Sequence, residues 1–309
     1  MSQVRLVEVA EDHAGQRLDN FLHRELKGVP KTRLYRALRK GEIRVNKGRV
    51  KADYRVQTGD LVRIPPIRIA EREQLDRVPK KYAQLLERHL AYEDPALWVI
   101  DKPSGLAVHG GSGLSFGLIE CLRLLRPDER FLELVHRLDR DTSGCIMVAR
   151  KGSMLKSLHE QLRKDRIDKR YLALVSGRWS AKRSFVEAPL RKNTLQSGER
   201  VVRVDGSGKP ARTEFRVIER FDNATLVEAK PITGRTHQIR VHALHAGHPI
   251  LGDDKYCGRE ANQWAKGRGL KRLFLHAAQL GFTDSGGSHR EVVAALDSNL
   301  EQILDNMRK

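Results

Sequence analysis

The sequence lacks any apolar run long enough to cross a membrane. A spanning helix needs about 18 or more predominantly apolar residues in succession, and no segment of the chain approaches that length. Residues 1–15 also lack the apolar stretch of a secretory signal. We therefore expect no membrane span and no membrane partner.

Cysteine and aromatic residues are scarce as well. The chain has 3 cysteines, Cys121, Cys145 and Cys257, which lie far apart without metal-binding spacing. Such cysteines are typical of reduced thiols in a cytoplasmic protein, not of a disulfide framework. Aromatic residues make up 6% of the chain, which gives no sign of an aromatic-rich oligomer interface, and we expect a monomer.

Positive charge, in contrast, is abundant. Lys and Arg total 58 against 39 Asp and Glu, which gives a formal net charge of +19. An excess of this size attracts polyphosphates and favours a nucleic-acid partner. An ordinary basic soluble protein is the alternative.

Residues 1–66 form a domain of their own in this interpretation. Apolar residues at helical spacing predict helices near residues 18–26 and 34–40, and short strands follow, the last over residues 61–64. Cations gather on the second helix and on the following hairpin: Arg33, Arg36, Arg39, Lys40, Arg44 and Lys47. Such a patch binds phosphates largely without regard to sequence, although a solvated basic helix face would have the same pattern.

Residues 67–88 have the composition of a linker, and residues 89–309 form the second domain. The linker follows two prolines and is charged, with few large apolar residues. In the second domain the patterns predict strands over residues 96–100, 145–149, 169–177 and 200–204, a hairpin of 211–220 with 225–230, and helices over 115–125, from Ser153 onward, from Thr233 to Gly247 and over 297–308.

One charged loop, within residues 135–150, opens onto a buried strand. Asp139 stands there between Arg137 and Arg140, and Gly144 lets the backbone turn into the strand. A carboxylate held among guanidiniums is oriented by charge-assisted hydrogen bonds, which suits a nucleophile or a base. Solvated surface salt bridges would produce the same composition.

Three sequence blocks carry a resemblance to a known family. HRLDRDTSG (136–144), KPSGLAVHGG (102–111) and GRTHQIRVH (234–242) resemble motifs of the RluA-type pseudouridine synthases, in the same order, and residues 1–66 resemble the S4 RNA-binding domain. The resemblance covers almost the whole chain. It implies an α+β fold: an S4-like RNA-binding domain and a catalytic domain whose mixed, mainly antiparallel sheet is flanked by helices.

The resemblance also implies roles for single residues. Asp139 matches the catalytic aspartate, Tyr171 the active-site tyrosine and Arg240 the partner of the aspartate; from the residues alone, either Arg235 or Arg240 could approach Asp139. Arg137 would fill the space left by a flipped nucleotide, and Leu273 or Leu275 would line the base pocket. Leu275 and Lys102 are placed among the residues that contact RNA or assist base flipping.

The chemistry that these residues imply needs no metal and no cofactor. Forming pseudouridine breaks the N1 to C1′ bond of uridine and rejoins the ring through C5, without a redox or phosphoryl step, while water must be kept out. Whether Asp139 attacks the sugar, attacks the base or first takes a sugar proton is open. His237, His242, His245 and His248 lack metal-binding spacing, and the glycine-rich loop at 110–117 lacks nucleotide-binding spacing, so this loop is either a wall near the substrate or purely structural.

The expected function is therefore isomerisation of specific uridines in RNA. The sequences around the motifs are closest to the branch of the family that modifies several uridines of 23S rRNA, so the expected partner is 23S rRNA or a large-subunit precursor. The alternatives are a non-catalytic S4-type RNA-binding or ribosome-assembly protein, a tRNA-directed pseudouridine synthase, and an N-glycosidase that uses the same carboxylate.

Overall fold

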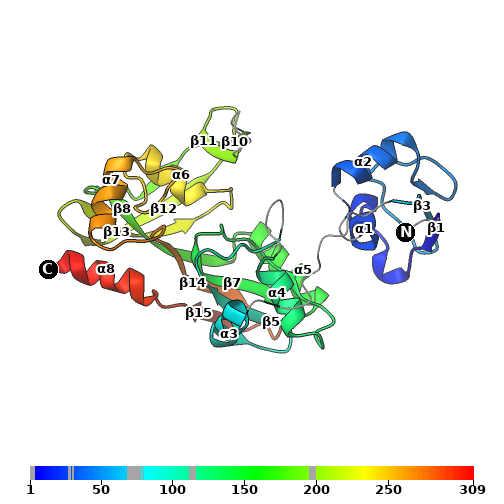
Figure 1. The fold of residues 1–309 in the computed structure, drawn as a ribbon, viewed down its shortest axis with the longest axis horizontal. Helices are drawn as coiled ribbons and strands as arrows, with labels where there is room; N and C mark the ends of the chain where they lie inside the picture. The colour runs from blue at the N-terminus through cyan, green and yellow to red at the C-terminus, as the bar shows by residue number, and fades with distance from the viewer. Residues whose placement is uncertain are drawn as a thin grey trace. The chain divides into compact units, whose positions relative to one another are not determined.

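The chain forms two compact units, Met1–Leu75 and Asp76–Lys309 (Figure 1). The computed structural model describes residues 4–26, 29, 31–67, 78, 80–110, 116–194 and 200–309. Each unit has its own apolar core, as expected of an independent domain.

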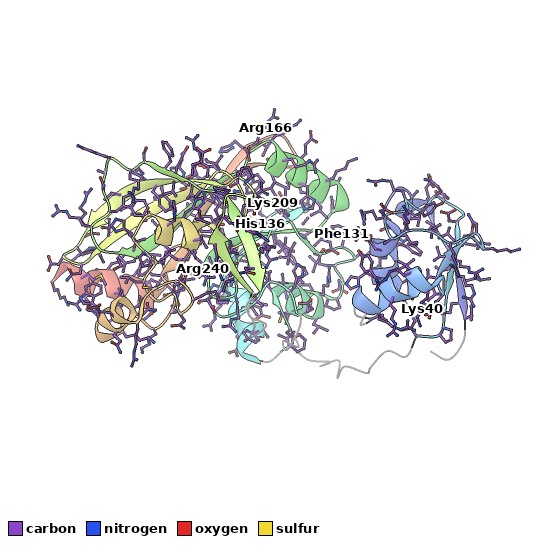
Figure 2. The ribbon with its side chains drawn as sticks, turned by 90° about the horizontal axis from the view of Figure 1, so that it is seen from above. Lys40, Phe131, His136, Arg166, Lys209 and Arg240 are labelled. Carbon is purple, nitrogen blue, oxygen red and sulfur yellow. The ribbon has the colours of Figure 1, made fainter. Side chains whose placement is uncertain are left out.

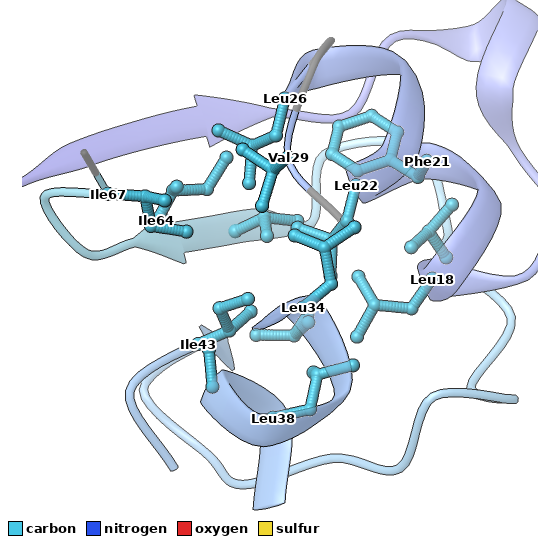
Figure 3. Close-up of a cluster of buried hydrophobic side chains, with 14 of the residues drawn as sticks. Leu18, Phe21, Leu22, Leu26, Val29, Leu34, Leu38, Ile43, Ile64 and Ile67 are labelled. Atoms are coloured by element: carbon cyan, nitrogen blue, oxygen red, sulfur yellow. The ribbon is translucent and has the colours of Figure 1, made fainter. Parts of the chain in front are cut away.

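The first unit packs two helices on a small antiparallel sheet. Its elements are β1 (Arg5–Glu8), α1 (Leu18–Glu25), α2 (Lys31–Lys40), β2 (Arg44–Val45) and β3 (Leu61–Ile64), and β3 is the central strand. Figure 3 shows the core between them, where Leu18 and Leu22 of α1 face Leu34 and Leu38 of α2. The spacing of these leucines puts them on one stripe of each helix, which leaves the cations of α2 outside.

The segment predicted as a linker, residues 67–88, contains a helix. Residues 68–77 lie outside the described residues, but α3 (Lys80–Arg88) is helical and contacts α4 (Leu118–Leu125). Leu86 of α3 is buried in the core of the second unit. The helix therefore belongs to the second unit, although its charged composition resembles a linker.

The second unit is built on a 10-stranded sheet, counted over the described residues. The sheet contains β4 (Leu90–Glu93), β5 (Leu97–Lys102), β6 (Glu133–Leu134), β7 (Ser143–Ala149), β8 (Asp168–Ser176), β9 (Phe185–Glu187), β12 (Arg212–Arg220), β13 (Ala224–Pro231), β14 (Leu275–Thr283) and β15 (His289–Val293). Outside it lie the hairpin of β10 (Leu190–Thr194) with β11 (Arg200–Val204) and the helices α5 (Gly152–Arg163), α6 (Gln238–His245), α7 (Arg259–Gly267) and α8 (Ser298–Arg308). Among the strands that the structure describes, only β7 and β14 pair in parallel, so the predicted mixed, mainly antiparallel sheet flanked by helices is confirmed.

The strands bury both faces by alternation. In β7, Ile146 and Val148 face the cluster with α3 and α4, whereas Met147 faces the cluster with α5. In β8, Ala173 packs toward α6, and Leu174 packs toward α7 and α8. Successive side chains of a strand point to opposite faces, so one short strand supplies two cores.

Gly144 sets how closely β7 and β14 approach each other. It has φ +103°, and a Cβ built there would lie 2.3 Å from the carbonyl oxygen of Ala277. A side chain would therefore meet both a strained backbone conformation and a clash. Ala277 also pairs with Tyr171 of β8, so this seam brings the loop before β7 next to Tyr171.

The boundaries differ from the prediction at α6. The helix begins at Gln238, and His237 before it adopts a left-handed conformation at φ 53°. The Thr233 hydroxyl does not cap the helix, because it donates a hydrogen bond to the side chain of Gln238 at 2.7 Å. The predicted hairpin of β12 and β13 is confirmed, with Arg220 opposite Thr225.

Candidate active site

A pocket of about 350 Å³ opens where five segments of the second unit meet. It is lined by the loop before β7, the end of α5 with Asp165, the start of β8, residues 231–237 with α6, and the start of β14. Figure 2 labels His136 and Arg240, which lie far apart in the sequence of this unit. A concave site where polar side chains converge is where substrate binding is expected.

Asp139 and Arg240 face each other across this pocket. Arg240 Nη1 donates a hydrogen bond to Asp139 Oδ2 at 3.1 Å. The Asp139 side chain is 20% exposed, so one side of the carboxylate is open to the pocket while the other is held by the guanidinium. Arg235, the other arginine that the sequence left open, lines the pocket, but its Nε donates to the carbonyl of Pro210 instead.

Asp253 fixes the position of Arg240. Its carboxylate accepts two hydrogen bonds from Arg240, at 2.7 Å from Nε and 2.8 Å from Nη2. Arg240 is 7% exposed and Asp253 is 1% exposed. Burial opposes the charge of Arg240, but the hydrogen bonds that Arg240 donates to Asp253, together with the negative charge of Asp253, outweigh this effect and raise the pKa of the guanidinium. Arg240 is therefore a permanent cation held in one orientation.

Tyr256 and His237 complete the surroundings of this ion pair. The guanidinium carbon of Arg240 lies 4.9 Å from the centre of the Tyr256 ring. The Tyr256 hydroxyl accepts a hydrogen bond from the Val202 amide and lies 2.7 Å from His237 Nδ1. The phenol hydrogen is thus free to donate to Nδ1, which assigns the proton of the imidazole to Nε2. Burial lowers the pKa of His237, and its Nε2 lies 3.7 Å from Asp139 Oδ2.

Tyr171 and Leu275 supply the less polar wall. Both line the pocket, whereas Leu273 does not. Burial, with a contribution from the charge of Asp139, raises the pKa of Tyr171, so the phenol is neutral at physiological pH. Its hydroxyl has no hydrogen-bond partner among the described residues, which leaves that group available to a substrate.

His136 is the neutral member of the loop. Its Nε2 accepts a hydrogen bond from the Met147 amide at 3.2 Å, which requires the unprotonated nitrogen. Burial, and then the charge of Lys169, lower the pKa of His136 to about 3. The residue therefore anchors the loop to β7 and adds no charge to the pocket.

Lys102, for which an RNA contact was predicted, is buried instead of lying on a surface that RNA can reach. It is 0% exposed. Its ammonium donates to three backbone carbonyls, of Pro103 at 2.9 Å, Leu106 at 2.8 Å and Arg140 at 3.0 Å. Burial lowers the pKa of Lys102 to about 7, against the opposing charges of Asp141 and Asp139. Lys102 thus holds the main chain next to Asp139, since a buried polar group must be paired.

The remaining predicted contacts are on the surface. Arg137 is exposed at the pocket. In the first unit Arg36, Arg39, Lys40, Arg44 and Lys47 are exposed, whereas Arg33 is half-buried and pairs with Glu42 at 3.1 Å. The first five are accessible to a phosphate backbone; Arg33 is committed to a neighbour.

Asp253, Tyr256 and His237 are functional candidates that the sequence did not reveal. His237 stands out in the sequence only as one of several histidines without metal-binding spacing, and Asp253 and Tyr256 lie outside the three motif blocks. No pattern signals that Asp253 lies beside Arg240, because their contact joins a helix to the loop after it.

The structure holds no candidate metal centre and no candidate membrane span within its described ranges. Over these residues, no group of three or more His, Cys, Asp or Glu side chains is arranged to hold a metal ion. No described helix is long and apolar enough to cross a bilayer. The central residues 111–115 of the glycine-rich loop lie outside the described residues, so its predicted place beside the substrate stays a prediction.

Comparison with protein families gives two matches. A model described as RNA pseudouridylate synthase matches residues 96–245, and a model described as the S4 domain matches residues 16–62. The first range contains Asp139, Tyr171 and Arg240.

Curated proteins and solved structures are similar over long stretches. The "Ribosomal large subunit pseudouridine synthase C" of Yersinia pestis is 58% identical over 309 residues, covering 99% of this chain and 96% of that protein. The protein of the same name from Escherichia coli strain K12 is 57% identical over 310 residues, covering 99% and 97%. The solved structure of human RNA pseudouridylate synthase domain containing 4 has a TM-score of 0.61 at 29% identity, covering 74% of this chain and 96% of that one.

Proposed function

The chain belongs to the RNA pseudouridylate synthase family, and from this premise we propose that it converts several specific uridines of 23S rRNA to pseudouridine. The relatives that match the chain along nearly its full length are named for the large ribosomal subunit, which supports 23S rRNA or its precursor as the partner. The net charge of +19 suits such a polyanion.

The substrate nucleotide leaves its stack before the reaction. The glycosidic bond of a stacked uridine is out of reach of a carboxylate that lines a pocket, so the nucleotide is flipped out of the helix. The pocket of about 350 Å³ receives the uracil. Arg137, exposed at its rim, fills the space that the nucleotide leaves.

Asp139 acts directly on the flipped nucleotide. Its carboxylate is open toward the pocket and held on the other side by Arg240, so it is already oriented when the substrate arrives. It attacks the sugar or the base, or takes a sugar proton, as the N1 to C1′ bond breaks. The uracil then turns and C5 bonds to C1′, while any bond to Asp139 breaks again. The hydrogen of C5 leaves as a proton and N1 takes up a proton, so the reaction is an isomerisation.

The other pocket residues keep the detached uracil in place. Tyr171 is neutral and stacks on the ring, with its hydroxyl free to take part in a proton transfer. Leu275 closes the apolar side. A lining of this kind limits the access of water, which would otherwise capture the sugar.

The observation that carries this proposal is the hydrogen bond of 3.1 Å between Arg240 and Asp139 beside Tyr171. The test is chemical mapping of pseudouridine in 23S rRNA from a strain that lacks the gene, with the purified protein then added to RNA from that strain. We expect several uridines to remain unmodified in the strain and to be converted by the protein. Unchanged 23S rRNA together with missing pseudouridine in tRNA would favour a tRNA-directed enzyme.

Two further alternatives are separated by the products. An N-glycosidase would release free uracil from the RNA, whereas a synthase releases none. A non-catalytic assembly protein would bind the RNA without changing any uridine.

A further inference from the structure

A second hollow, of about 410 Å³, lies beside the active-site pocket. Residues 190–192 of β10, Val202 of β11 and the turn 207–209 line it, and residues 234–236 line both the hollow and the active-site pocket. One loop is therefore the shared wall between the two spaces. Figure 1 shows the β10–β11 hairpin projecting from the second unit, and Figure 2 labels Lys209 on the turn.

The lining of the hollow combines a positive rim with an apolar floor. The cations on the lining are Arg191, Lys192, Lys209 and Arg235, and no Asp or Glu is among the described lining residues. Arg191 pairs with Asp205 at 3.4 Å, whereas Lys192 and Lys209 are exposed and have no ion-pair partner within the described part of the chain. Leu190 and Val202 form the floor, each 5% exposed.

The walls of the hollow are braced by hydrogen bonds. Arg235 Nε donates to the carbonyl of Pro210, which ties the shared loop to the turn. The Lys209 and Leu190 backbones exchange two hydrogen bonds of 2.9 Å. A Cβ at Gly208 would lie 2.6 Å from the carbonyl carbon of Leu190, so the close approach of turn and strand requires glycine.

The hollow is also connected to the reacting centre. Val202 of its floor donates through its amide to the hydroxyl of Tyr256, and that hydroxyl contacts His237 at 2.7 Å. His237 in turn faces Asp139. A ligand bound against Val202 would therefore contact β11, whose backbone is hydrogen-bonded to Tyr256 beside the active-site pocket.

From this arrangement we propose that the hollow binds a nucleotide adjacent to the target uridine, with its base on the Leu190–Val202 floor and its phosphate between Lys192 and Lys209. The inference rests on the proposed function. An RNA chain that places its target uridine in the active-site pocket would continue over the shared loop, residues 234–236, into the hollow. An RNA nucleotide has the matching chemistry, an apolar ring face joined to an anion. The site thus contributes to the choice of target by holding a second base out of the stack.

The charge of the rim is tested with the double variant Lys192→Glu and Lys209→Glu in the full chain. Its matched control is Lys266→Glu with Lys271→Glu, two exposed lysines that line neither space. On the RNA identified by pseudouridine mapping, we expect the KM of the hollow variant to rise at least about tenfold relative to the control, with a smaller change in kcat. Equal KM values for the two variants would overturn the inference.

The base is tested with RNAs that carry an abasic nucleotide immediately before or after the target uridine. One of the two should lower kcat/KM of the unmodified protein by about 5- to 150-fold, the range of base stacking, and by less in the Lys192→Glu, Lys209→Glu variant. Unaltered kcat/KM with both abasic RNAs would overturn the proposed base site. Failure of the unmodified protein to form pseudouridine in the intact RNA would instead defeat the proposed function.

Discussion

Asp253 binds the guanidinium of Arg240 through both carboxylate oxygens, at 2.7 and 2.8 Å, and leaves Nη1 to donate to Asp139. The planar guanidinium has a fixed fork of donors, so fixing two of its nitrogens fixes the third. The orientation of Asp139 is therefore set from a residue that does not itself line the pocket.

Replacing Asp253 with Asn should impair turnover more than RNA binding. The variant loses the charge that opposes Arg240, and a misplacement of about 1 Å costs on the order of 100-fold in rate. We expect kcat to fall by about that factor at nearly unchanged KM, with a lower free energy of unfolding. The control is Glu219→Gln, which removes a bidentate but exposed pair with Arg308 and should leave kcat unchanged. A KM effect without a kcat effect would contradict the positioning role.

Asp139→Asn should retain RNA affinity and lose activity. The amide keeps the size of the carboxylate but is neither a nucleophile nor a base, so we expect a loss of at least about 10⁴-fold in single-turnover rate. Gel-shift affinity and pseudouridine formation are measured on the same RNA. Residual activity near that of the unmodified protein would remove Asp139 from the mechanism.

Lys102→Met distinguishes an anchor from an RNA contact. The substitution leaves three buried carbonyls without their donor, so we expect a loss of roughly 3 kcal/mol or more in the free energy of unfolding and a lower kcat. The slope of log affinity against log salt should stay unchanged, because no phosphate contact is lost. A slope reduced by about one unit would restore the RNA contact that the sequence suggested.

The cations of α2 should act on RNA binding alone. Substituting Arg36, Arg39 and Lys40 by alanine removes exposed charges without touching the core, so we expect weaker binding and a flatter salt dependence, by up to about three units of slope. The rate at saturating RNA should be retained. Lys266→Ala with Lys271→Ala on the other unit is the control, and an equal loss in both would argue against a binding role of α2.

Acid should destabilise the second unit partly through His136. Its pKa is lowered to about 3 in the folded chain. Below about pH 6.5 the imidazole is therefore protonated in the unfolded chain but stays neutral in the folded chain. His136 therefore leaves the free energy of unfolding undiminished above that pH. As the pH falls toward 3, His136 lowers the free energy of unfolding by up to about 1.4 kcal/mol per pH unit. His136→Gln, which keeps an acceptor for Met147, should reduce the slope measured by thermal unfolding, whereas His245→Gln at an exposed site should not. Identical slopes would contradict the assignment.

The fold could largely be predicted from the sequence, because the side chains of a strand point alternately to opposite faces of the sheet. In β7 and β8 this alternation indicates which side chains share a face. Helix ends were less accessible. Thr233 has the properties of a helix cap, but its hydroxyl donates a hydrogen bond to the side chain of Gln238. The left-handed backbone of His237 lies before the helix. The charged composition of α3 likewise hid a helix in which Leu86 is buried.

The residues of the site also differ in how far the sequence indicated them. The structure brings Asp139, Arg240 and Tyr171 together as their motifs suggested. The burial of Lys102 could not be predicted, because a lysine in a sequence gives no sign that three backbone carbonyls surround its ammonium. Asp253 was missed because its contact with Arg240 forms only when the chain folds back beside α6.

The anchoring of the Asp139 loop through Lys102 has a consequence for sequence variation. Lys102 holds the carbonyl of Arg140 and Ser104 holds the carbonyl of Asp141, and every amino acid possesses that oxygen. Saturation libraries at positions 140 and 141 should therefore yield many functional clones, while those at 102 yield few. The conformation of the loop is held through its backbone carbonyls. The side chains at positions 140 and 141 can therefore vary and adapt to different RNAs.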